Sequence, residues 1–181
     1  MGTRVLAVVV ALTTFFTSSL AAVGQGEDRL ATFLAALMGD RNTRIVFTER
    51  EAVALMNEGA RELFADVGAV SAHVNSVRFA ADTATVNTDL RVGRISLRPQ
   101  VTFAAHTEGE NVVLHIKRMR VGIVPVSVAA TLAGIRAGGV PDYMQIHPLA
   151  GRIVVRKRGD VRYLEDIDIG GGTVTLTVQR R

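Results

Sequence analysis

Side chains that could bind a metal ion or catalyse a reaction are few in this sequence, and their spacing forms no recognised site. The four histidines are His73, His106, His115 and His147, and the closest pair is nine residues apart (115 − 106), so no His-x-His or His-x-x-x-His pair exists. The chain has no cysteine, which excludes disulfides, zinc–thiolate sites and a thiol nucleophile. We therefore expect each histidine to be an ordinary strand or loop residue.

One acidic stretch, Glu165–Asp168, precedes three glycines and could suggest calcium binding. Strand alternation would place Asp166 and Asp168 on one face, but two carboxylates fall short of the roughly six to eight oxygens that calcium takes. A hairpin turn is the preferred interpretation. The sequence also lacks Gly-x-Ser-x-Gly and the glycine-rich phosphate-binding motifs. We therefore predict no enzymatic activity, no cofactor and no metal site.

The start of the chain indicates export. Arg4 precedes a charge-free run of 20 residues (24 − 5 + 1), Val5–Gly24, and Glu27 and Asp28 follow it. About 20 apolar residues suffice to cross a bilayer as a helix, and the flanking charges favour an N-terminus inside the cell. The run predicts a single-pass anchor in the cell membrane. The alternative is a signal peptide cleaved near Ala22-Val23-Gly24, which would release a secreted protein.

Composition favours one folded domain after this segment. The chain has 181 residues, of which 48% are hydrophobic and 21% charged, and its net charge is +4. We divide it into 1–26, anchor or signal peptide, and 27–181, a single extracytoplasmic domain. Aromatic content of 5% without tryptophan argues against nucleic acid as a partner. The alternating basic stretch Arg152–Arg158 is either a solvated strand face or a face attracted to anionic lipid.

Helical periodicity is strongest after Thr48. A short helix is expected over Glu27–Met38, and Thr48–Glu51 reads as a capping box, in which the threonine and glutamate side chains bind each other's backbone N–H groups. An amphipathic helix should follow over about Glu49–Val67, and a second short helix should contain Val128, Leu132 and Ile135. The glutamates of the longer helix are expected on its solvated side: Glu49, Glu51 and Glu58.

Between and after the helices the apolar period is two. The phase slips at Gly93, which suggests a bulge or bend within a long strand, and slips again before Met119. Glu108–Asn111 reads as a hairpin turn, and Pro141–Pro148 as a connection. Three terminal segments read as strands: Arg152–Arg158, Val161–Ile169 and Thr173–Val178. These elements predict an α+β fold in which a long, strongly curved antiparallel sheet wraps around the Val53–Val67 helix.

Several soft patterns carry a family resemblance. They are Val46–Ala52, a strand running into a threonine-glutamate helix start; Arg94–Val101 followed by Asn111–Leu114; and Val121–Pro125, glycine, aliphatics and proline before a short helix. On these, Thr43 to Val178 resembles the YpmS-like family of small bacterial proteins with one N-terminal membrane segment, within the TULIP-like (tubular lipid-binding) superfamily. At Ala52–Ala54 the chain departs from the leucine-asparagine pair expected there, and Asn57 is placed to take the polar role.

The resemblance implies a curved sheet on a helix, with an apolar groove that holds acyl chains and performs no chemistry. We therefore expect a membrane-anchored, extracytoplasmic protein that binds a phospholipid, an acyl chain or another apolar ligand in that groove. The alternative is a cell-envelope interaction or assembly module whose core is closed and holds no ligand. The residues expected to line the groove are Met56, Leu63, Phe64, Leu97, Phe103, Val121 and Leu132.

Overall fold

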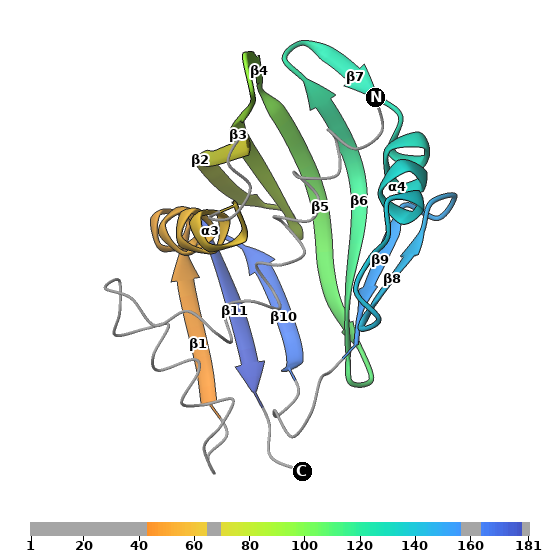
Figure 1. The fold of residues 1–181 in the computed structure, drawn as a ribbon. Coiled ribbons are helices and arrows are strands. Elements are labelled where there is room, and N and C mark those ends of the chain that lie inside the picture. The colour runs from red at the N-terminus through yellow and green to blue at the C-terminus, as the bar shows by residue number, and fades with distance from the viewer. Residues whose placement is uncertain (1–42, 65–69, 157–163, 179–181) are drawn as a thin grey trace.

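The computed structural model describes residues 43–64, 70–156 and 164–178, without the side chains of 62–64 (Figure 1). The expected anchor Val5–Gly24 and the expected helix Glu27–Met38 lie outside this part of the chain. Among the described residues, no helix is long and apolar enough to span a membrane.

The described residues form two antiparallel sheets and two helices, as an α+β fold requires. The helices are α3 (Glu49–Phe64) and α4 (Val128–Ala137). The strands are β1 (Thr43–Thr48), β2 (Val70–Ala80), β3 (Thr83–Val92), β4 (Ile95–Leu97), β5 (Pro99–Glu108), β6 (Asn111–Val121), β7 (Val124–Val126), β8 (Met144–His147), β9 (Arg152–Val155), β10 (Leu164–Gly170) and β11 (Thr173–Val178). The larger sheet has the order β2-β3-β5-β6-β9-β8, with β4 paired to β3 and β7 to β6, and the smaller sheet has the order β1-β11-β10.

The prediction of one strongly curved sheet wrapped around the helix is wrong. The larger sheet is not strongly curled, β1, β11 and β10 form a sheet of their own, and α3 lies where the two sheets meet (Figure 1). The reason lies partly at Gly93, which begins a two-residue turn between β3 and β4 and is not a bulge in a continuous strand. Its φ of +59° and the +61° of Gly122 in the β6–β7 turn suit glycine at the first position of a tight hairpin. The chain therefore folds back at Gly93, where a bulge or bend was expected, and again at Gly122, where no turn was expected.

Of the other strand predictions, two are confirmed and one is wrong. The second phase slip is a bulge: Thr102 faces Arg118 and Phe103 faces Ile116, so Lys117 is the extra residue. The glycine turn before β11 is present, with φ of +59° at Gly171. The segment taken as a connection, Pro141–Pro148, contains β8, a strand that the alternation of so few residues did not reveal.

Helix α3 is fixed at its start and along its length by side-chain hydrogen bonds. The capping box is confirmed, because Thr48 N–H donates to Glu51 Oε2 at 2.8 Å and Glu51 N–H donates to Thr48 Oγ1 at 3.3 Å. Asn57 binds both backbone groups of Val74: its Nδ2 donates to the carbonyl at 2.9 Å, and its Oδ1 accepts from the N–H at 2.7 Å. Helix α3 is therefore fastened to the edge strand β2.

Glu49 corrects the expectation that the glutamates of α3 only face solvent. Its Oε1 accepts a hydrogen bond from the backbone N–H of Phe79, also on β2, at 2.8 Å. Together with Asn57 this satisfies backbone groups along the outer edge of the larger sheet, where no further strand pairs with β2 among the described residues. Glu49 therefore has a structural role that helical periodicity alone did not reveal.

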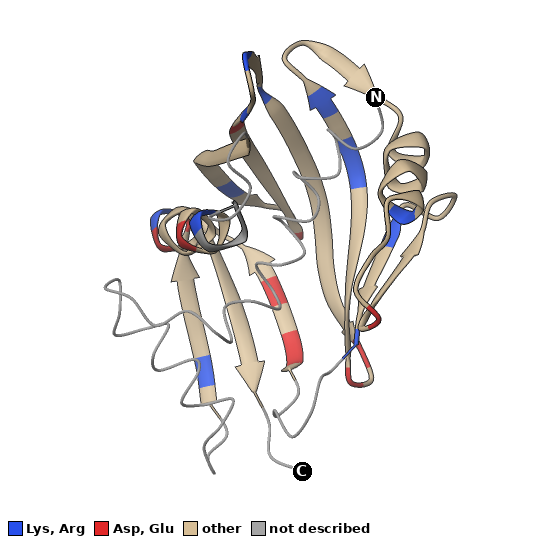
Figure 2. Cartoon of the chain, viewed as in Figure 1, with Lys and Arg blue, Asp and Glu red and all other residues tan. Residues whose placement is uncertain are grey.

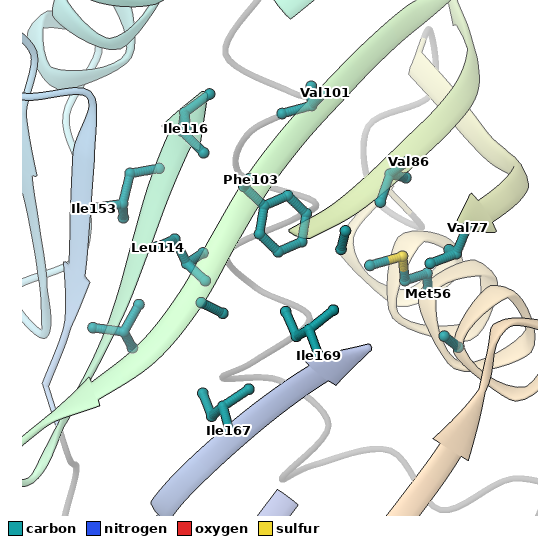
Figure 3. Packing of buried hydrophobic residues seen from close by; sticks show 14 of the residues in the cluster. Met56, Val77, Val86, Val101, Phe103, Leu114, Ile116, Ile153, Ile167 and Ile169 are labelled. Atoms are coloured by element: carbon teal, nitrogen blue, oxygen red, sulfur yellow. The ribbon is translucent and has the colours of Figure 1, made fainter. Parts of the chain in front are cut away.

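Two hairpin turns join the sheets. The N–H of Asp82, in the β2–β3 turn, donates to the carbonyl of Ile169 at 3.2 Å, and Gly172 N–H donates to the carbonyl of Phe79 at 3.3 Å. Side chains from both sheets and both helices then share one buried cluster. Figure 3 shows Met56 of α3, Phe103 of β5 and Ile169 of β10 pointing toward this common interior.

Replacing Asn57 by alanine is expected to destabilise the fold by about 2 kcal/mol, because the N–H and carbonyl of Val74 lose their partners. Urea unfolding of the purified full chain followed by circular dichroism measures this change. Glu58→Ala, one residue along the same helix, is the control and should change stability by less than about 0.5 kcal/mol. Equal effects of the two substitutions would contradict the role given to Asn57.

Ala81 holds a left-handed backbone conformation, with φ of +46°, which alanine tolerates poorly. Ala81→Gly is therefore expected to stabilise the protein by about 1 kcal/mol. Ala80→Gly, in the adjoining strand, should instead destabilise it by roughly 0.5–1 kcal/mol. Thermal unfolding midpoints that move in the same direction for both variants would show that the turn is not strained.

Candidate functional site

The larger sheet has one apolar and one polar face. On β3 the side chains of Ala84, Val86 and Leu90 are each 1% exposed and belong to the buried cluster. Asn87 and Asp89, which alternate with them, point to the opposite side. We call the first side the inner face and the second the outer face.

An apolar tract runs along the inner face toward the end that carries the β3–β4 and β6–β7 turns. Register joins its members in two neighbouring groups: Leu90 faces Leu97 and Val92 faces Ile95 in the first, and Val101 faces Met119, Met119 faces Val126 and Val121 faces Val124 in the second. These nine residues are the apolar tract: Leu90, Val92, Ile95, Leu97, Val101, Met119, Val121, Val124 and Val126.

Burial decreases steadily along this tract. Leu90 and Val101 are 1% exposed, whereas Leu97 and Val126 are only partly buried against the cluster. At the end of the sheet, Val124 is 60% exposed. Apart from Thr88, which is 6% exposed between Val86 and Leu90, the inner face of this end stays apolar as far as the surface, where a sheet end in water would ordinarily become polar.

The residues predicted to line a groove are only partly brought together. Met56, Phe103 and Leu132 are 7%, 2% and 0% exposed and lie in the same cluster, with Leu97 partly buried against it. Val121 is half-buried at the end of β6, within the apolar tract. The side chains of Leu63 and Phe64 lie outside the described part of the chain.

The two helices border the central strands. Helix α3 packs against β2 and β1, and α4 packs against β8 and β6 (Figure 1). Leu132 and Ile135 of α4 are buried in the common cluster. The apolar tract thus lies on the strands between the two helices, at one end of the sheet.

Sequence reasoning missed the exposed end of the tract, although a signal was present. The pattern apolar-Gly-x-apolar, which the sequence also holds elsewhere, stands at Val92–Ile95 and at Val121–Val124, and in these two cases the glycine starts a two-residue hairpin turn. Reading both as hairpin turns would have placed Ile95 and Val124 at neighbouring hairpin tips.

The outer face carries a polar network. Thr85 and Thr102 hydroxyls are 3.0 Å apart, and Gln100 Nε2 donates to Asn87 Oδ1 at 2.7 Å. Asn87 Nδ2 in turn donates to Ser76 Oγ at 2.8 Å. These side chains satisfy one another across β2, β3 and β5, so this face suits contact with water or polar groups and not with an apolar ligand.

Charged and imidazole side chains gather at the other end of β5 and β6. Arg152 Nη2 donates to both carboxylate oxygens of Glu108, at 2.8 and 2.7 Å, and His106 Nε2 lies 3.1 Å from Glu108 Oε1. The hydrogen bond with His106, and then Arg152, lower the pKa of Glu108 against the opposing effect of burial. This partly exposed cluster has an ordinary structural function as a surface ion pair.

His115, on β6, lies beside a lysine. Its Nδ1 is 3.2 Å from Lys117 Nζ. Burial lowers the pKa of the His115 imidazole below its usual 6.5, and the charges of Lys117 and Arg152 lower it further.

The acidic stretch before the last hairpin does not gather ligands in the part of the chain that the structure describes. Asp166 and Asp168 are exposed on one face of β10, as alternation predicts. Across all the described ranges, no group of three or more His, Cys, Asp or Glu side chains is placed to hold a metal ion.

The chain was compared with protein-family models, with curated proteins and with solved structures, and none of them matches it. The resemblance to the YpmS-like family therefore stays a prediction, and function has to be argued from the apolar tract.

Lowering the pH below about 6.5 is expected to destabilise the fold through His115, because the unfolded state takes up the proton first. The contribution of this histidine is complete above 6.5 and is lost as the pH falls through its lower folded-state pKa. Lys117→Met should raise that folded-state pKa, and Arg44→Met on β1 should not. NMR titration of the His115 ring protons measures both, and an unchanged midpoint in Lys117→Met would refute the coupling.

Proposed function

We propose that this chain is a membrane-anchored, extracytoplasmic protein that binds a lipid acyl chain or another apolar ligand between the larger sheet and its helices. The observation that carries the proposal is the apolar tract, which leads from buried Leu90 and Val101 to exposed Val124, with buried Thr88 as a polar side chain beside Leu90 on the same face of β3. The segment Val5–Gly24 would supply the anchor, which would hold the domain near lipid.

The energetics favour such a ligand. Each CH₂ group moved from water into an apolar site contributes about 0.8 kcal/mol, so even half an acyl chain gives useful affinity. A ligand would reach the interior past half-buried Leu97 and Val126. The nearby Met119 is a flexible side chain that can adapt to different chain positions.

The resemblance stated from the sequence agrees with this function. A YpmS-like, TULIP-like protein would bind lipid between a sheet and a helix, and Met56, Phe103 and Leu132 would then form the deep part of the site with Leu97 and Val121 nearer its opening. In this protein the larger sheet, which is not strongly curled and is bordered by α3 and α4, would take the place of a strongly curved one.

A second function is favoured by one observation. Leu90 and Val101 are each only 1% exposed, so the inner part of the tract is already packed without a ligand. The chain would then be an interaction or assembly module of the cell envelope, with a closed core and an apolar sheet end that contacts a protein partner.

Native mass spectrometry of the full chain, extracted from membranes with a mild detergent, tests the first function. We expect bound lipid, identified after solvent extraction, and a loss of at least about tenfold in Val126→Glu, because a charge at the half-buried opening opposes an acyl chain. Leu149→Glu is the matched control, because Leu149 is 98% exposed and lies outside the tract. Its lipid content should equal that of the unchanged chain.

Two outcomes would contradict this function. Protein that is consistently empty would exclude a resident lipid, and protein crosslinked in intact cells to one partner without lipid would favour the assembly module. Equal lipid content in Val126→Glu and the unchanged chain would place any lipid outside the tract. Circular dichroism of Val126→Glu is needed in each case to show that the variant is folded.

A further inference from the structure

The end of the larger sheet exposes large apolar side chains on two neighbouring hairpin turns. Ile95 is 46% exposed in the β3–β4 hairpin, and Ile123 and Val124 are 93% and 60% exposed in the β6–β7 hairpin. The N–H of Gly122 donates to the carbonyl of Arg98 at 2.9 Å, which holds the second turn against the chain between β4 and β5. The exposed side chains Ile95, Ile123 and Val124 are here called the apolar tip.

Ile123 makes almost no contribution to the fold. With 93% of its surface in water it packs against very little of the protein, and the adjacent Gly122, not Ile123, supplies the backbone conformation that the turn needs. A polar residue would satisfy folding equally well at this position. An isoleucine so exposed, next to Val124, therefore suggests a surface that is buried by something else.

Basic side chains lie close to the tip, mainly on the outer face of the sheet. Arg91, Arg94 and Arg98 are exposed on β3, in the turn and before β5, and Arg120 is half-buried on β6. Figure 2 shows this end of β3, β4 and β6 with its basic residues in blue. The acidic Asp89 lies at 3.3 Å from Arg98 Nε, in an exposed pair that neutralises only part of this charge.

The two chemistries lie on different sides of one sheet end. Arg91 and Arg120 alternate with inner-face residues along their strands and so lie on the outer face, whereas Ile95 and Val124 continue the inner face. This end therefore presents apolar groups at its tip, with positive charge directly beside them. Apolar groups that enter the acyl boundary, combined with cations at headgroup level, are the combination that binds a membrane interface.

We propose that the apolar tip and its arginines form a docking surface for an anionic lipid bilayer. Ile95, Ile123 and Val124 enter the boundary between headgroups and acyl chains, and Arg91, Arg94, Arg98 and Arg120 bind lipid phosphates. The inference goes beyond the apolar ligand of the previous section and holds whether or not the tract binds one. Lipid is favoured over a protein partner because a row of arginines with little opposing charge matches a phosphate surface.

A fluorescent label tests the depth of the tip directly, because the chain has no cysteine of its own. Ile123→Cys in the full chain is labelled with an environment-sensitive dye and placed with vesicles of phosphatidylcholine plus phosphatidylglycerol that carry nitroxide-labelled acyl chains. We expect several-fold quenching at this position. Quenching reports only on the immediate surroundings of the dye. Anchoring of the chain by Val5–Gly24 would therefore not by itself quench a dye at position 123.

Leu149→Cys is the matched control, an apolar residue that is 98% exposed in the β8–β9 turn. Gly151, two residues further on in the same turn, accepts a hydrogen bond from Ile116 N–H. Val121, at the β6–β7 turn, lies five residues beyond Ile116 along β6 (121 − 116), about 16 Å from it. Label at Leu149 should stay in water and be little quenched. Equal quenching at Ile123 and Leu149, or none at either, would overturn the proposal.

The charge requirement is tested with Arg94→Gln and Arg120→Gln. Each substitution is expected to reduce the preference for vesicles containing phosphatidylglycerol over pure phosphatidylcholine by about fivefold, and Arg44→Gln on β1 should leave it unchanged. Equal effects of all three substitutions would overturn the assignment of this surface. A dye response at Ile123 that appears without vesicles as protein concentration rises would also overturn it, and would identify a second copy as the occupant.

Discussion

The fastening of α3 to strand β2 is the contact on which the arrangement of this protein depends. The edge of the larger sheet exposes backbone groups at β2, and helix α3 supplies the partners through Asn57 at Val74 and Glu49 at Phe79. A sheet edge left unpaired in water is a site for aggregation, so these bonds both place the helix and protect the strand. They also fix the direction in which the chain passes from the smaller sheet to the larger one.

That placement brings the two sheets together. Strand β1 leads directly into α3 through the capping box at Thr48, so a helix fixed on β2 holds β1 and the strands paired with it close by. The turns at Asp82 and Gly172 then exchange backbone hydrogen bonds with β10 and β2. The buried cluster is shared by both sheets because these polar contacts define how the sheets meet. Hydrophobic burial supplies most of the free energy, and the hydrogen bonds select the geometry.

Local features were predictable from the sequence, and contacts between distant segments were not. The capping box at Thr48–Glu51 needs only four consecutive residues, and α4 is visible from its own apolar period. Glu49 was misjudged because its partner, Phe79, is 30 residues away. Gly93 was misjudged for another reason: a glycine at a phase slip is compatible with both a bulge and a two-residue hairpin, and only the pairing of Val92 with Ile95 distinguishes them. The burial of Met56, Phe103 and Leu132 was predictable from apolar periodicity, but periodicity alone does not tell a core from a site.

The short strands β4 and β7 are the part of the fold that core stability explains least. Each has three residues and continues the inner face beyond the strands that the helices cover. Their apolar side chains become more exposed toward the turn, from half-buried Leu97 to Ile95 and from half-buried Val126 to Val124. Side chains that gain little burial add little to folding, yet both hairpins keep them on the same face and at the same end.

A surface of this kind is stabilised only when something apolar covers it, and the arginines on the reverse side favour an occupant with negative charge at its surface. The same end would then meet the bilayer and lead inward along the apolar tract, so docking at the tip would bring an acyl chain within reach of Leu97 and Val126.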